Sequence, residues 1–187
     1  MTRNTRFLTR TALLLALTLV FQFAGRQIAF ALGLAAFQNF IVGPLVNLVL
    51  LVATVMAGFW GGAVVALLSP LGALLTGGLT EPLFLAIVGI GNLLLVAAFA
   101  LGDRMGSGRK ASATLALRIL GLLAGTGLKT AWLWGGILLY VDRMGLPAKQ
   151  AGALVFAFSW PQAVTAAVGG GLALVLLPVL EKGFRKT

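Results

Sequence analysis

The sequence contains no cysteine and no histidine, and only 4 of its 187 residues are aspartate or glutamate. Without cysteine the chain has no disulfide, no thiolate nucleophile and no cysteine-based metal site. Without histidine it lacks the commonest general base and the commonest transition-metal ligand. The carboxylates are far apart in the sequence, and we interpret most of them as loop residues: Glu81, Asp103, Asp142 and Glu181. This composition argues against an enzyme and predicts no metal site.

Charge of either sign is scarce, and most of it is positive. Charged residues make up 10% of the chain, whereas a soluble domain carries about 25%. Hydrophobic residues make up 60%, and the mean hydropathy is +1.06. The net charge of +10 comes from cations that cluster at the ends of apolar runs, so membrane topology explains it better than nucleic-acid binding does. We therefore expect one domain, residues 1–187, whose solvent is the lipid bilayer, with no nucleic-acid partner.

Six apolar segments are long enough, or nearly long enough, to cross a hydrocarbon core of about 30 Å as helices. They span residues 8–32, 39–57, 60–75, 82–101, 114–140 and 147–177. Glycine, proline and polar residues occupy the joints between them. Pro70 interrupts the third segment, and we expect it to kink or end that helix and to free a carbonyl. The predicted fold class is an all-α integral membrane protein with six transmembrane helices.

Lysine and arginine are distributed unevenly between the two ends of these segments. If both termini are cytoplasmic, nine cations fall on the cytoplasmic side: Arg3, Arg6, Arg10, Arg104, Arg109, Lys110, Lys182, Arg185 and Lys186. The loops of the other side then hold only Arg143 and Lys149, as the positive-inside rule predicts. A cleaved N-terminal signal peptide is the alternative, but it would leave five spans, and Arg26 fits it poorly.

A lysine lies inside the fifth apolar segment, in the stretch GTGLKTAWLWGG. Lys129 is eleven residues from the expected outer end at Tyr140, or about 16 Å along a helix. A cation at this depth usually faces a cavity or a partner. Helical spacing places Lys129, Trp132 and Tyr140 on one stripe, which suits a ligand pocket. The alternative is that Lys129 binds a helix C-terminus or a carbonyl as part of the packing.

Further candidate residues are expected near the same depth. Arg26 either turns inward to join Lys129 in an outer cavity or extends its charge to the outer surface. Polar or amphipathic side chains of the later segments add Asn92, Trp160 and Gln162. Glu81 follows two glycines in a loop that could cover the cavity, where it either contacts a ligand or is solvated. Since the carboxylates are too few to neutralise two buried cations, the expected partner is an anionic solute.

Small residues mark one face of the first segment. Ala12 and Ala16 are four residues apart, a spacing that lets another helix approach closely. The chain also lacks a GxxxxGK[ST] phosphate-binding loop. We therefore expect no cofactor in this chain.

The six spans, the Ala12-x-x-x-Ala16 motif and the stretches NFIVGPLVNLVLLVATVMAGFWGGAVVALLSPLGALLTG and IVGIGNLLLV resemble the substrate-binding S component of an energy-coupling factor transporter. The resemblance covers essentially the whole chain. It implies a bacterial plasma-membrane subunit that captures a vitamin or related micronutrient from outside. A separate membrane scaffold subunit and two ATPases would power uptake and use the ATP. It also implies that Ala12 and Ala16 contact the scaffold and that the pocket lies near the outer side.

Together these observations predict capture of an organic, anionic micronutrient, such as pantothenate, biotin, lipoate or a folate. Lys129 would bind a carboxylate, and Asn92 and Gln162 would orient polar groups. Aromatic rings would enclose the apolar body of the ligand, from Trp132, Tyr140 or Trp160. The alternatives are a stand-alone secondary transporter and a non-transport membrane enzyme or assembly protein. Secondary transporters usually have membrane carboxylates or two related halves, and the sequence shows neither.

Overall fold

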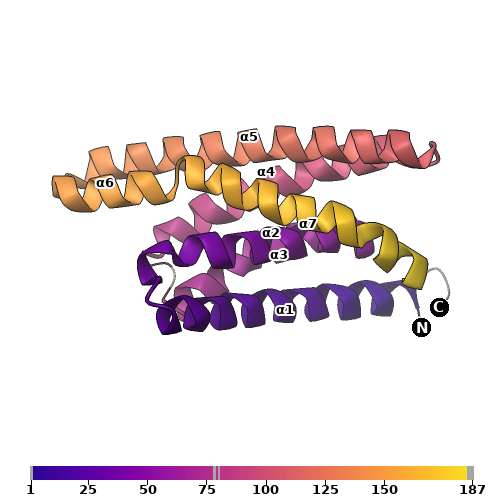
Figure 1. Cartoon of the computed structure of the whole chain (residues 1–187), viewed down its shortest axis with the longest axis horizontal. Helices are drawn as coiled ribbons and strands as arrows, with labels where there is room; N and C mark the ends of the chain where they lie inside the picture. The colour runs from indigo at the N-terminus through magenta and orange to yellow at the C-terminus, as the bar shows by residue number, and fades with distance from the viewer. Residues whose placement is uncertain (1, 78, 80, 185–187) are drawn as a thin grey trace.

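The computed structural model describes residues 2–77, 79 and 81–184, which form a bundle of long helices (Figure 1). The helices are α1 (Arg3–Ala31), η1, a 3-10 turn (Ala35–Phe37), α2 (Gln38–Met56), α3 (Gly58–Leu75), α4 (Leu83–Gly106), α5 (Ala111–Met144), α6 (Ala148–Ala157) and α7 (Trp160–Phe184). Within these described ranges there is no strand. Six helical segments are long and apolar enough to cross a membrane, judged by length and composition. The predicted all-α, six-span fold class is confirmed.

Glycines bring α4 and α5 into close contact along their length. A Cβ atom on Gly121 would lie 2.7 Å from the carbonyl oxygen of Ala98, and one on Gly125 would lie 2.9 Å from that of Leu95. Helices in lipid associate largely through such close packing, because lipid chains are as apolar as leucine. The other main contacts join α2 to α7, α3 to α4, and α1 to both α2 and α3.

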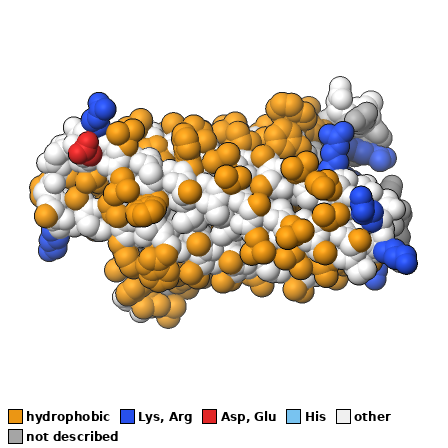
Figure 2. All heavy atoms as spheres, turned by 90° about the horizontal axis from the view of Figure 1, so that it is seen from above, with side chains coloured by type: hydrophobic (Ala, Val, Ile, Leu, Met, Phe, Trp, Pro, Cys, Tyr) orange, Lys and Arg blue, Asp and Glu red, His pale blue; other side chains and the backbone are white. Residues whose placement is uncertain are grey.

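The start of α1 and the end of α7 lie at the same end of the bundle, which we call the terminal end (Figure 1). We call the opposite end the distal end. Lysine and arginine side chains gather at the terminal end, while hydrophobic side chains cover the flanks (Figure 2). Arg143 and Lys149 lie near the distal end, where α5 ends and α6 begins. Of the nine cations assigned to one side, Arg185 and Lys186 lie outside the described residues. The side chain of Arg3 is also outside the described part of the chain, and the remaining six cations follow the predicted asymmetry.

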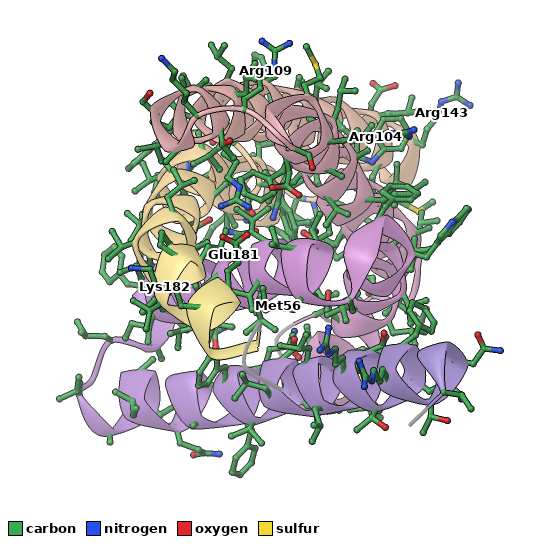
Figure 3. The ribbon with its side chains drawn as sticks, turned by 90° about the vertical axis from the view of Figure 1, so that its right-hand side faces the viewer. Met56, Arg104, Arg109, Arg143, Glu181 and Lys182 are labelled. Atoms are coloured by element: carbon green, nitrogen blue, oxygen red, sulfur yellow. The ribbon has the colours of Figure 1, made fainter. Side chains whose placement is uncertain are left out.

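A buried arginine joins three helices at the terminal end. The Nε of Arg118, on α5, donates to Oδ1 of Asp103 on α4 at 2.6 Å. Its guanidinium also donates to Oε1 of Glu181 on α7 at 2.5 Å. Figure 3, seen from this end, shows Glu181 between the helices and Lys182 on the outside of α7.

The interpretation of most carboxylates as loop residues was therefore wrong. Asp103, Asp142 and Glu181 all lie within helices, and only Glu81 lies in a connecting segment. The helices α4, α5 and α7 continue several residues past their apolar stretches, because a helix can extend beyond the hydrocarbon core into the polar interface.

Pro70 does not end its helix. It lies within α3, which continues to Leu75. Proline has no N–H to donate to the carbonyl four residues earlier, that of Ala66. The hydroxyl of Ser69 donates to this carbonyl instead, at 3.2 Å.

The sixth apolar segment is two helices rather than the single helix expected over 147–177. It breaks between Ala157, the end of α6, and Trp160, the start of α7. Pro161 has no N–H for the carbonyl of Ala157, and Nε2 of Gln162 donates to that carbonyl at 3.0 Å. Unlike Pro70, which lies in the interior of a helix, Pro161 lies in the first turn of α7, directly after the break.

Substitution of Gly121 tests the close approach of α4 and α5. We expect Gly121→Ala to destabilise the protein by about 1–3 kcal/mol, since the added methyl group meets backbone atoms that cannot move independently. Gly127→Ala, on the same helix, is the matched control, because nothing lies within 4 Å of its added Cβ. Thermal unfolding in detergent measures both; equal midpoints for the two variants would contradict the packing argument.

Candidate functional site

A cavity of about 360 Å³ lies where the helices converge in the distal half of the bundle. Each of the helices α1 to α7 contributes to its lining. The side chains with polar groups on this lining are Gln22, Arg26, Gln38, Asn39, Asn47, Ser69, Thr76, Asn92, Lys129 and Gln162. The larger apolar ones are Val42, Val46, Leu79, Phe84, Val88, Leu154 and Phe158. The cavity thus combines a polar wall with an apolar one, as small-molecule sites do.

Lys129 is buried at the inner part of this cavity. Its side chain comes from the middle of α5, and the residue is only 3% exposed. Its Nζ donates to Oδ1 of Asn47 on α2 at 2.6 Å. An amide oxygen accepts a hydrogen bond but carries no formal charge, so this contact orients the lysine without neutralising an ammonium group. No aspartate or glutamate that the structure describes lines the cavity.

Arg26 also lines the cavity, from the distal half of α1. One of its terminal nitrogens is buried and has no hydrogen-bond partner in the described part of the chain. The guanidinium carbon lies 5.2 Å from the ring centre of Phe30, within the range of a cation–π contact. Gly77, with φ of 74°, leaves room for it, since a Cβ there would come within 3.1 Å of the guanidinium. Of the two orientations considered for Arg26, the structure has the inward one.

A hydrogen-bonded row of neutral polar groups forms another part of the cavity wall. Nδ2 of Asn92 donates to Oγ of Ser69 at 3.2 Å. Nε2 of Gln22 donates to the carbonyl of Ser69 at 3.0 Å. Oε1 of Gln22 is buried without a partner among the residues described. Gln22 and Arg26 are one helical turn apart on α1, so an unpaired acceptor and an unpaired donor lie close along the same helix.

Four of the eight residues predicted to contact a ligand line this cavity: Arg26, Asn92, Lys129 and Gln162. Gln162 uses its amide nitrogen to bind the carbonyl of Ala157, so its amide oxygen is the group left for a ligand.

The other four lie outside the lining, so contact between them and a ligand stays a prediction. Trp132 is 41% exposed and its indole N–H donates to the carbonyl of Ile87 on α4, because α4 occupies the space beside it. Trp160 is 56% exposed and packs on Phe156. Tyr140 packs edge-on behind Phe84, with ring centres 5.0 Å apart. Glu81 is exposed in the connection between α3 and α4.

The aromatic side chains that line the cavity are Phe84 and Phe158, which were not among the predicted contacts. Their ring centres are 5.7 Å apart, so they form one continuous apolar surface. Phenylalanine is abundant in any membrane helix, so the sequence offered no signal for these two. Gln22 was detectable in principle, because it is a polar residue one turn before Arg26 inside an apolar helix.

The predicted docking residues Ala12 and Ala16 are both exposed on the outer face of α1. The buried face of the same helix carries Thr11, Thr18 and Gln22. The alanines therefore leave a shallow surface of the bundle open to a neighbour in the membrane.

Replacing Asn47 tests the hydrogen bond that holds Lys129. We expect Asn47→Leu to lower the free energy of unfolding by roughly 3 kcal/mol, because it leaves a buried polar group without its partner. Adding Lys129→Met should recover much of this loss, since both polar groups are then absent. Unfolding of the single and double variants in mixed micelles measures the effect. Strictly additive losses would show that the two side chains do not interact.

A protein-family model with the description "ECF transporter, substrate-specific component" matches residues 6–181. No curated protein and no solved structure matches the chain. The match extends from the start of α1 to the last turns of α7, so it includes all six apolar spans and the whole cavity lining. The chain therefore belongs to the family of substrate-specific components of ECF transporters, which are multi-pass proteins of the bacterial plasma membrane.

Proposed function

We propose that this chain captures an organic anion of micronutrient size in the distal cavity and delivers it for import. The distal end would face outward and the terminal end would face the cytoplasm, in accord with the positive-inside rule. The ligand would carry a carboxylate or a similar anionic group together with an apolar portion. The family assignment establishes a transporter subunit that binds a substrate, and the proposal adds the chemical class of that substrate.

The observation that carries the proposal is the partner of Lys129. A buried cation normally faces a counter-charge, yet this one contacts a neutral amide at the edge of a cavity. Arg26 adds a second cation with an unpaired nitrogen to the same lining. An anionic group entering the cavity would supply charge-assisted hydrogen bonds that the protein itself does not supply.

The size and lining of the cavity narrow the class of ligand. A volume of about 360 Å³ is at the lower end of the range of about 300–1,000 Å³ that small-molecule pockets occupy. This favours the smaller carboxylate vitamins over a folate. The surface formed by Phe84 and Phe158 suits an aliphatic or ring portion, while Asn92 and Gln162 suit amide or hydroxyl groups.

The energy for uptake would come from other subunits. The sequence has no phosphate-binding loop, so ATP would be hydrolysed by two ATPases that act through a membrane scaffold subunit. We propose that Ala12 and Ala16 form the face of α1 that contacts this scaffold. Their exposure on the bundle surface supports the proposal.

Mass spectrometry of small molecules that remain bound through purification in mild detergent tests the proposal directly. We expect an organic anion of about cavity size to be retained by the unmodified protein. Lys129→Met should weaken its binding at least about tenfold, because a hydrogen bond to a charged group contributes roughly 1.5–3 kcal/mol. Lys149→Met, the same substitution at an exposed position of α6, should leave affinity unchanged. Unchanged affinity in Lys129→Met would refute the anion-binding role.

Asn47→Asp separates charge from shape at the same site. The substitution is nearly isosteric and gives Lys129 an internal counter-charge, so we expect it to reduce anion affinity at least about tenfold. Titration calorimetry with the identified ligand measures this effect. If the ligand binds Asn47→Asp as tightly as the unmodified protein, its recognition does not depend on the charge of Lys129.

Docking through α1 predicts that bulk at Ala12 blocks assembly. We expect Ala12→Trp to abolish co-purification of the scaffold and ATPase subunits while leaving ligand binding intact. Leu17→Trp is the control, because it adds a ring at an exposed position of α1 about 140° from Ala12 around the helix. Uptake by the chain alone in liposomes, without ATPases, would instead support a secondary transporter.

A further inference from the structure

A groove of about 610 Å³ lies at the terminal end, separate from the ligand cavity and on the other side of the hydrophobic span. The first two turns of α1 form one wall, and the turn between α2 and α3 forms the other. Its lining residues are Asn4, Arg6, Phe7, Arg10, Met56, Ala57, Gly58, Phe59 and Trp60. The proposed function uses none of these residues.

Two arginines give this groove a positive charge. The guanidinium of Arg10 is anchored to the end of α2, where it donates to the carbonyl of Met56 at 2.9 Å. Arg6 is exposed one turn earlier, and the described residues provide no carboxylate on the groove lining. The carboxylates nearest to the terminal end, Asp103 and Glu181, are bound to Arg118. The charge of the groove is thus complementary to an anion.

Aromatic side chains place the groove at the level of the lipid headgroups. Trp60 is 72% exposed, and its ring packs edge-on against Phe59 with centres 5.1 Å apart. Exposed tryptophans are typical of the membrane–water interface. The sixteen residues from Arg10 to Arg26 span about 24 Å of helix. Because Arg26 lies in the distal half of the bundle and a hydrocarbon core is about 30 Å thick, Arg10 lies close to the opposite edge of the core.

We propose that this groove binds the headgroup phosphate of an anionic phospholipid. Arg6 and Arg10 contact the phosphodiester, while Phe7, Phe59 and Trp60 lie along the glycerol and the first acyl carbons. Arginines on a flat surface would attract anionic lipids only diffusely. Here a concave site joins two arginines to an aromatic wall, which provides contacts for one lipid molecule. The proposal is independent of the identity of the transported substrate.

Native mass spectrometry of the full chain in mild detergent tests this site. Phosphatidylglycerol and phosphatidylcholine with identical acyl chains are added at equal concentration, and inorganic phosphate is added in a separate arm. We expect preferential retention of phosphatidylglycerol that phosphate does not displace. Arg6→Gln should weaken this retention about fivefold, the effect of one arginine near an anionic lipid surface. Trp60→Ala should weaken it without a change in net charge.

Arg109→Gln is the matched control. Arg109 is an exposed arginine at the same end but outside the groove, so its replacement should leave phosphatidylglycerol retention unchanged. Equal losses in Arg6→Gln and Arg109→Gln would show diffuse surface charge and overturn the proposal. Equal retention of the two lipids would also overturn it, as would displacement by inorganic phosphate or unchanged retention in Trp60→Ala.

Discussion

The contact between Lys129 and the amide of Asn47 is the interaction on which the chemistry of the cavity depends. A cation in the middle of an apolar helix is costly unless a partner orients it, and the partner here is neutral. The four carboxylates lie elsewhere: Asp103 and Glu181 bind Arg118 at the terminal end, whereas Glu81 and Asp142 are exposed. Basic side chains therefore line the cavity, while the carboxylates of the protein lie away from it.

Two helical prolines account for part of the polar lining of the cavity. Pro70 deprives one carbonyl of its usual donor, and Ser69 satisfies that carbonyl while accepting a hydrogen bond from Asn92. Pro161 does the same near the start of α7, where Gln162 binds the freed carbonyl. Because a membrane interior offers little water to satisfy backbone groups, polar side chains are needed at each interruption. Irregular backbone and ligand-facing polarity thus occur at the same positions.

The helix α1 presents three separate surfaces along its length and around its circumference. Its distal half brings Gln22 and Arg26 to the cavity. Its middle exposes Ala12 and Ala16 on the side away from the bundle core. Its first turns form the basic groove at the terminal end. These surfaces share no side chain, so the proposed contacts with a ligand, a scaffold subunit and a lipid involve different residues of one helix.

The amino-acid sequence by itself determined that the chain lies in a lipid bilayer, that it has six spans and that its cations are unevenly distributed. Hydropathy and positive charge act on each segment locally, so no tertiary contact is needed to recognise them. The sequence also indicated Lys129 and Arg26 as candidate cavity residues, since a cation within an apolar run is conspicuous without any knowledge of its neighbours. Only the tertiary structure decided that Asn47 binds Lys129 and that Phe84 and Phe158 form the apolar wall. It also excluded Trp132 and Trp160 from the lining. The rotation of each helix about its axis is set by packing against neighbours distant in sequence, and no periodicity within one segment specifies it.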